Sequence, residues 1–233
     1  MLNFKNYPNV TEIYIPEDAI LKNGSANLFS NMYNLKKVNL PVSLQNNLSL
    51  TYYNCYNLIG SPTCGNNVNS MFTTYMYCNN LTGSPVCGNN VVDMTQTYAY
   101  CSNLTGNPVC GPNVTNMYYT YRECRNLTGS PVCGNKVKNM SYTYYNCYKL
   151  TGSPVCGNNV IDMSATYMHC NNLTGNPVCS SNVTNMQSTY RNCSKIKGNS
   201  ITGGNVIDMS FTYLNCWNLN GYSSCGNKVN NMC

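Results

Sequence analysis

The chain has 233 residues and a net charge of +6, yet only 9% of its residues are charged. Its Lys and Arg residues are scattered, so we expect no nucleic-acid partner, which would need a basic stripe or patch. No run of apolar residues approaches the ~18 that predict a membrane-spanning helix. The first residues, MLNFKNYPNV, lack the basic head and apolar stretch of a secretory signal.

Residues 1–50 are more charged and less regular than the remainder of the chain. Repeat proteins need atypical terminal units with a polar outer face. We therefore predict that residues 1–50 form an N-terminal cap.

Residues 51–233 consist of eight tandem copies of a 23-residue unit. Residues 74–94 read TYMYCNNLTGSPVCGNNVVDM, and residues 143–163 read TYYNCYKLTGSPVCGNNVIDM. A fixed period between about 20 and 50 residues is the signature of a solenoid. Each copy is numbered here from 1 to 23, starting at Thr51, Thr74, Thr97, Thr120, Thr143, Thr166, Thr189 and Thr212.

Five of the following six repeat positions keep one residue in all eight copies, and the sixth, position 8, varies only between Leu and Ile. Position 2 is Tyr, position 5 is Cys, position 8 is Leu or Ile, position 10 is Gly, position 18 is Val and position 21 is Met. One coil alone buries little, but stacked coils place each of these apolar side chains above its counterpart and share a core. In the first copy, the predicted core ladder consists of Tyr52, Cys55, Leu58, Val68 and Met71.

The apolar residues around one repeat boundary have the spacing of a helix face. The intervals are 3, 4, 3 and 3 residues for Val160, Met163, Tyr167, Cys170 and Leu173. Asn159 is a favourable N-cap, Asp162 lies near the positive end of such a helix, and Gly175 ends it with a positive φ. The following Pro-Val-Cys segment predicts a brief strand that Pro introduces, because Pro cannot donate to a ladder. The expected fold is an α/β solenoid of about eight coils, each with a short strand and a helical segment.

The repeat also resembles the BspA-type leucine-rich repeat, whose pattern is roughly NVTNMSxMFxxCxxLTxLDLS. Residues 182–186 read NVTNM, and Tyr190 and Cys193 stand where that family has Phe-x-x-Cys. Within residues 1–50, VTEIYIPEDAI and LFSNMYNLKKVNLPVSL look like two divergent repeats. Pro-Val-Cys replaces the family's Leu-Asp-Leu-Ser strand, and Thr-Tyr replaces its Met-Phe pair. The resemblance implies a leucine-rich-repeat-like solenoid on a cell or virion surface, which binds a protein or a surface glycan and is not an enzyme.

Sixteen cysteines occur, mainly at positions 5 and 14. Three interpretations compete. The cysteines are buried free thiols that pack as small apolar residues, or they form disulfide rungs within each coil, or they bind metal. The seventh copy has Cys193 at position 5 but Thr202 at position 14, which disfavours a strict disulfide scheme. Zinc sites favour Cys pairs about two to four residues apart, and the wider spacing here disfavours metal. We expect no metal or other cofactor, and we expect Cys233 to be the most exposed thiol.

No arrangement of side chains predicts catalysis. His169 is the single histidine and occupies the variable position 4, with no nucleophile or carboxylate placed to work with it. The position-20 carboxylates are interpreted as helix-start electrostatics rather than as acid–base pairs; they are Asp93, Asp162 and Asp208.

The variable positions carry aromatic and charged side chains that suit a binding surface. Exposed Tyr gives a large contact area at a small entropic cost. The alternative is that these residues are merely the solvated side of a rod. The candidate binding-face residues are Tyr77, Tyr100, Arg122, Glu123, Arg125, Tyr145, Tyr148, Arg191 and Trp217.

The eighth copy stops at Cys233, one residue short of a full period. An uncovered solenoid edge invites pairing, so Val229, Met232 and Cys233 are candidate end-contact residues for a homo-oligomer. We predict a non-enzymatic rod for surface adhesion or protein recognition. The alternative is a structural subunit of a phage tail or fibre, or of a cell-surface filament, that stacks end to end. A redox or metal-storage role for the thiols is a third hypothesis.

Overall fold

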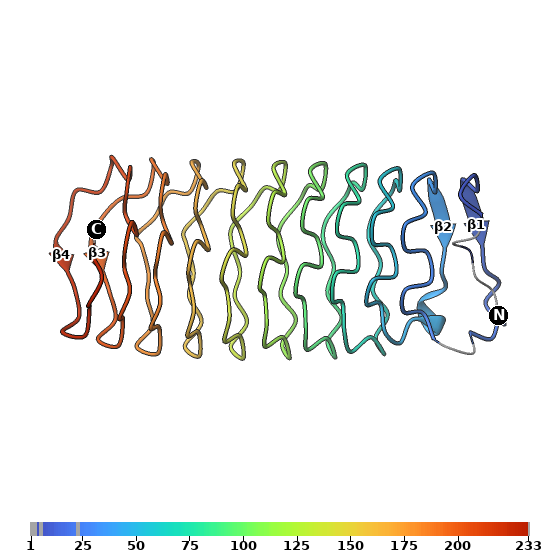
Figure 1. Cartoon of the computed structure of the whole chain (residues 1–233), viewed down its shortest axis with the longest axis horizontal. Helices are drawn as coiled ribbons and strands as arrows, with labels where there is room; N and C mark the ends of the chain where they lie inside the picture. The colour runs from blue at the N-terminus through green and yellow to red at the C-terminus, as the bar shows by residue number, and fades with distance from the viewer. Residues whose placement is uncertain (1–3, 5–6, 22–23, 233) are drawn as a thin grey trace.

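The protein is a single solenoid whose coils stack along its long axis from the N-terminal to the C-terminal end (Figure 1). The structure is a computed structural model, and it describes residue 4 and residues 7–21 and 24–232. Within these residues, no helix has the length and apolar character needed to cross a membrane.

Regular secondary structure is sparse and lies near the two ends. Strand β1 (Glu12–Tyr14) pairs in parallel with β2 (Lys37–Asn39), and the 3₁₀-helix η2 (Val42–Leu44) follows. Strand β3 (Ser200–Ile201) pairs in parallel with β4 (Ser223–Ser224). Between them, single parallel β-bridges join residues at position 20 of successive coils, from Ser70 to Asn231.

The predicted helical segment is wrong, because consecutive β-turns occupy that part of each coil. In the coil around residue 166, Thr166 N–H donates to the Met163 carbonyl and Cys170 N–H donates to the Tyr167 carbonyl, at 3.0 and 2.9 Å. The third residues of these turns, Ala165 and His169, have φ values of 50° and 65°. Positive φ at the third residue is the mark of a type II turn and is incompatible with a right-handed helix. Turns of this length give inward-facing residues the same three- and four-residue spacing as a helix face.

The turns leave alternate peptide groups pointing along the solenoid axis, where they bond to the next coil. The N–H groups at positions 21, 23, 2 and 4 donate to the carbonyls at positions 20, 22, 1 and 3 of the following coil. Tyr144 N–H, for example, donates to the Thr166 carbonyl at 2.9 Å, and Asn146 N–H to the Met168 carbonyl at 3.0 Å. Since buried main-chain groups must be paired, each coil depends on its neighbour for this ladder.

The strand predicted at Pro-Val-Cys is also wrong in the copies that carry Pro. In those copies, the hydroxyl of the Tyr at position 2 of the next coil bonds both the main-chain N–H and the carbonyl of the residue at position 13. Val155 N–H donates to the Tyr167 hydroxyl at 3.1 Å, and that hydroxyl donates to the Val155 carbonyl at 2.7 Å. In the last two copies Ser200 and Ser223 replace Pro, and this segment pairs directly as β3 and β4, with Ser200 N–H donating to the Tyr222 carbonyl at 2.9 Å. Proline lacks the N–H that this pairing requires.

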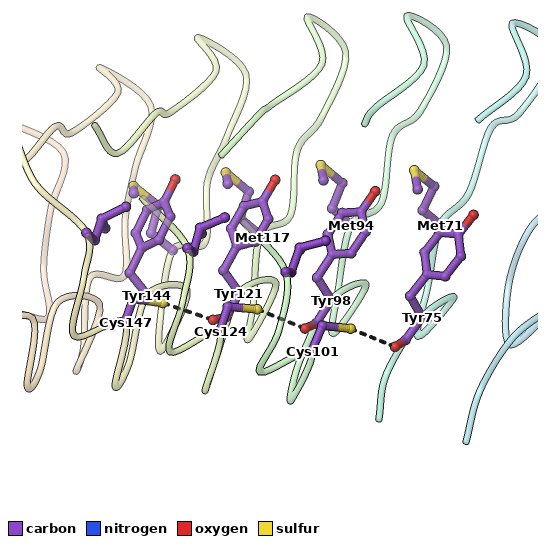
Figure 2. Packing of buried hydrophobic residues seen from close by; sticks show 14 of the residues in the cluster. Met71, Tyr75, Met94, Tyr98, Cys101, Met117, Tyr121, Cys124, Tyr144 and Cys147 are labelled. Carbon is purple, nitrogen blue, oxygen red and sulfur yellow. Dashed lines mark hydrogen bonds between the residues drawn. The ribbon is translucent and has the colours of Figure 1, made fainter. Parts of the chain in front are cut away.

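The core is a set of side-chain ladders that run the length of the solenoid. The five members named from the first copy, Tyr52, Cys55, Leu58, Val68 and Met71, are all buried. Figure 2 shows the Tyr and Met ladders, with neighbouring Tyr rings such as Tyr98 and Tyr121 stacked at a centroid distance of 5.6 Å. Each Cys at position 5 donates its thiol hydrogen to a carbonyl of the preceding coil; the acceptor is Phe29 for Cys55 and the position-2 Tyr for the others, as for Cys124 and Tyr98 at 3.0 Å (Figure 2). Each thiol of this ladder therefore has a hydrogen-bond partner, so the ladder leaves no buried thiol unsatisfied.

The 23-residue step continues backward into the first 50 residues. Asn27 and Asn31 have the same positive φ as their counterparts 23 residues later, Leu50 and Asn54. Phe29 stacks on Tyr52 at 5.5 Å, so residues 28–50 form a coil in register with the repeats.

Candidate binding face

A hollow of about 480 Å³ opens on the face formed by positions 23 and 3 of coils in the second half of the solenoid. Its shape follows from residue size at position 23. Tyr142 and Phe211 are large, but the two coils between them carry Ala165 and Ser188. The short side chains leave a depression between bulky neighbours. The lining residues are Tyr119, Arg122, Tyr142, Tyr145, Ala165, Met168, Gln187, Ser188, Arg191 and Phe211.

Arg122 occupies one end of the hollow, inside a cluster of tyrosine rings. Its guanidinium carbon lies 4.6 Å from the centroid of the Tyr119 ring and 4.9 Å from that of Tyr145. The Tyr100 and Tyr142 rings lie slightly farther away, at 5.7 and 5.8 Å. These distances permit cation–π attraction, which is stronger when the cation is desolvated. The rings therefore hold the planar guanidinium in a defined orientation.

Arg191 lies at the other end of the hollow, at the same repeat position as Arg122 and three coils later. Its guanidinium carbon is 5.7 Å from the Phe211 ring centroid. The Nε atoms of both arginines are buried without a hydrogen-bond partner in the part of the chain that the structure describes. Both residues as a whole are half-buried, and both line the hollow.

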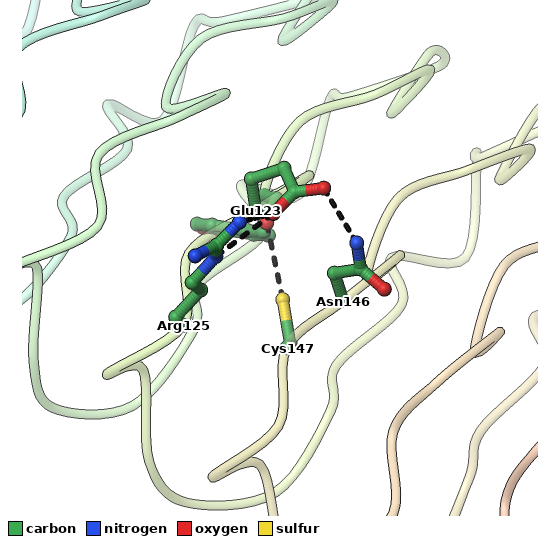
Figure 3. Close-up of polar contacts among 5 residues, drawn as sticks. Glu123, Arg125, Asn146 and Cys147 are labelled. Carbon is green, nitrogen blue, oxygen red and sulfur yellow. Dashed lines mark hydrogen bonds and ion pairs between the residues drawn. The ribbon is translucent and has the colours of Figure 1, made fainter.

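Beside the hollow, Glu123 and Arg125 form a separate polar cluster (Figure 3). Glu123 is only 9% exposed; its carboxylate forms an ion pair with Arg125 at 3.0 Å and also accepts a hydrogen bond from the Asn146 amide. Beneath it, Cys147 Sγ belongs to the buried thiol ladder (Figure 3). The negative charge of Glu123 is thus neutralised by Arg125 and is not available to Arg122.

The structure brings three of the nine sequence-predicted face residues into the hollow: Arg122, Tyr145 and Arg191. Tyr77 stacks on Tyr100 at 4.7 Å, so both extend the aromatic surface next to Arg122. Glu123, Arg125 and Tyr148 lie in the neighbouring cluster, with the Arg125 guanidinium 6.0 Å from the Tyr148 ring. Trp217 is exposed on the last coil and does not line the hollow.

Of the predicted end-contact residues, Val229 is half-buried and Met232 is exposed. Cys233 lies outside the described residues.

Seven residues that line the hollow are not among the nine predicted from the sequence: Tyr119, Tyr142, Ala165, Met168, Gln187, Ser188 and Phe211. The signal that would have found them is the change in side-chain size along position 23, from Tyr119 and Tyr142 to Ala165 and Ser188 and back to Phe211. This change in size predicts a hollow only if position 23 is already known to face outward.

The titratable groups considered for catalysis, His169 and the position-20 carboxylates, make contacts that support the fold. His169 is half-buried and contacts the Asn192 amide at 3.1 Å, and burial together with the nearby Arg191 charge lowers the pKa of its imidazole. Asp162 accepts hydrogen bonds at its side chain from Ser164 N–H, two residues on, at 2.8 Å. Asn139 makes the same bond to Ser141 N–H at 2.8 Å. Position 20 therefore supports a turn rather than a helix start, and Asn serves as well as Asp.

The cysteines form two ladders of different depth. All fifteen described cysteines are free; those at position 5 are buried, those at position 14 in the first six copies are half-buried, and Cys225 is exposed. Within the described residues, no group of three or more His, Cys, Asp or Glu side chains is placed to hold a metal ion.

No family model and no curated protein matches this chain. Among solved structures, it is similar to a leucine-rich cell surface protein from Faecalibacterium prausnitzii A2-165, at 14% sequence identity and a TM-score of 0.42. The similarity covers 94% of this chain and 89% of that protein.

Proposed function

We propose that this protein is a non-enzymatic recognition rod that binds a ligand at the hollow between Arg122 and Arg191. One observation supports this most directly: two arginines and four aromatic rings converge on a concave surface of about 480 Å³. That volume is within the range of small-ligand sites, and Tyr and Arg are the residues enriched where binding energy concentrates. On the resemblance to BspA-type repeats, the rod is exposed on a cell or virion surface, where it serves adhesion or recognition.

The chemistry of the lining favours binding over catalysis. The ten lining residues include hydroxyl, amide and guanidinium groups but no carboxylate, imidazole or thiol. The hollow therefore lacks the imidazole and carboxylate groups that most often carry general acid–base catalysis. The rings and the ladder hydrogen bonds hold the surface rigid, which lowers the entropic cost of binding.

The test is to probe glycan and protein arrays with labelled protein and with a double variant, Tyr145→Ala with Arg191→Ala. We expect the wild-type protein to bind a defined subset of ligands and the variant to lose that binding while keeping its fold. The matched control, Lys138→Ala with Lys149→Ala, changes two exposed residues outside the hollow. Equal loss in the control, or no specific binding to either array, would favour the alternative role of a structural subunit, which electron microscopy would show as filaments.

A further inference from the structure

Among the residues that the structure describes, no acidic side chain forms an ion pair with either guanidinium group at the ends of the hollow. The ion pairs in the described part of the chain are Lys37–Glu12 and Arg125–Glu123, and neither lies in the hollow. Arg122 and Arg191 are three coils apart, which at ~5 Å per coil places them roughly 15 Å from each other along the axis. The hollow thus presents two separated cations, each able to make paired hydrogen bonds to a carboxylate or sulfate.

Between the arginines, the surface is aromatic at one side and polar at the floor. The Tyr142 and Tyr145 rings lie 5.8 Å apart at an interplanar angle of 43°, next to the shallow floor at Ala165. Gln187 and Ser188 add an amide and a hydroxyl, which donate and accept hydrogen bonds. Ring faces that pack against apolar C–H groups, together with amide and hydroxyl partners for hydroxyl groups, match the two kinds of surface that a sugar ring presents.

The backbone of this face is not available for a peptide strand. Ala165 N–H donates to the Gln187 carbonyl, and Ser188 N–H to the Ser210 carbonyl, both at 2.8 Å along the axis. Peptide recognition by strand addition needs an unpaired edge, and here the ladder between coils uses these groups. Strand addition therefore does not account for binding here, and the side chains that line the hollow provide the recognition groups.

We propose that the hollow binds an acidic glycan, whose carboxylate or sulfate groups bond Arg122 and Arg191 while its sugar rings rest on Tyr142, Tyr145 and the floor between them. This inference rests on the proposed recognition function and specifies its ligand class.

The experiment measures binding of the full chain by calorimetry to four probes of similar length: a polygalacturonate oligomer, a heparin oligomer, a neutral maltooligosaccharide and poly-L-glutamate. We expect one or both acidic glycans to bind and the neutral glycan and the polypeptide not to bind. Arg122→Gln and Arg191→Gln should each weaken binding by about 10-fold or more, since each removes a charge-assisted pair. Raising the salt concentration should weaken binding to the wild-type protein more than to either variant.

Lys138→Gln is the matched control, because it removes the same charge from an exposed residue outside the hollow. It should leave the affinity within about 2-fold, as expected for a distant exposed charge. Thermal unfolding of every variant establishes that it is folded; the arginines are half-buried at the surface, so we expect no loss of fold.

The outcomes separate this inference from the proposed function. Equal binding of the neutral glycan, or unchanged affinity in both arginine variants, would overturn the acidic-glycan assignment while leaving recognition at the hollow intact if Tyr145→Ala still abolishes binding. Binding of poly-L-glutamate alone would assign an acidic peptide instead. Comparison of the two acidic glycans distinguishes a carboxylated from a sulfated ligand.

Discussion

At the scale of single residues, the position-2 tyrosines do more than fill the core. In the coils that follow a Pro-containing copy, this hydroxyl bonds both main-chain groups of the position-13 residue in the preceding coil, as Tyr144 does with Val132 at 3.0 Å to the N–H and 2.8 Å to the carbonyl. This contact replaces a sheet ladder where Pro interrupts the main chain. Burial raises the pKa of the Tyr144 hydroxyl, so it remains protonated and able to donate at any ordinary pH.

We predict that Tyr144→Phe lowers the free energy of unfolding by about 2 kcal/mol, because it leaves an N–H and a carbonyl without their partner. Tyr145→Phe is the matched control: its ring is half-buried at the surface, and it should change stability by no more than about 0.5 kcal/mol. Urea unfolding of both variants provides the measurement. Equal effects would show that the hydroxyl bridge does not stabilise the coil.

The two cysteine ladders should resist alkylation in the folded protein. Burial raises the pKa of the Cys87 and Cys133 thiols to about 12, so at pH 8 almost no reactive thiolate is present. We expect Cys225, which is exposed, to be labelled first among the described cysteines.

Mass spectrometry of native protein treated with iodoacetamide locates the labelled residues. A thiol count on unfolded, unreduced protein completes the test. Fewer than sixteen free thiols would contradict the free-thiol ladders and restore the disulfide interpretation.

At the scale of the coil, the type II turns determine the local conformation. Residues at positions 23 and 4 adopt positive φ although many are Tyr, Glu, Gln or Phe. Such a conformation costs a residue with a side chain roughly 1–2 kcal/mol. The positive φ persists because it turns the peptide groups along the solenoid axis, where they form hydrogen bonds with the next coil.

Two buried alanines test the cost of positive φ. Ala165 has a φ of 50°, whereas Ala99 is not among the residues with positive φ. Ala165→Gly relieves the strain, whereas Ala99→Gly only adds freedom to the unfolded chain. We predict that the Ala165→Gly variant is more stable than the Ala99→Gly variant by about 1 kcal/mol, measured by thermal unfolding. The opposite order would contradict the turn assignment.

The repeat period was enough to predict the stacking and the buried ladders, because identical residues 23 positions apart must occupy equivalent sites. It could not distinguish a helix from successive turns, since both give inward residues a spacing of 3 and 4. Asn at position 4, as in Asn54, Asn146 and Asn192, was a sign of left-handed φ that the helical interpretation overlooked. The hollow was only partly predictable: Arg122, Tyr145 and Arg191 stood out by chemical type, but Ala165 and Ser188 contribute by being small.

At the scale of the whole molecule, each coil contacts mainly its two neighbours, and stability is therefore a sum of nearest-neighbour terms. Because every coil carries equivalent residues at equivalent positions, one coil can take the place of another without changing which residues stack. The residues that line the hollow lie between Tyr119 and Phe211, so a coil nearer the N-terminal end can be removed without removing any of them.

Deletion of residues 74–96, which is one full period, tests the in-register stacking most directly. We predict a folded protein that keeps the hollow and whose maximum dimension in small-angle X-ray scattering is shorter by roughly 5 Å, one coil spacing. Deletion of residues 77–96 removes three residues fewer and serves as the control, because it places unlike residues above one another and should unfold the coils around it. An unfolded full-period deletion, or a control that folds equally well, would contradict the stacking of like residues on which the account depends.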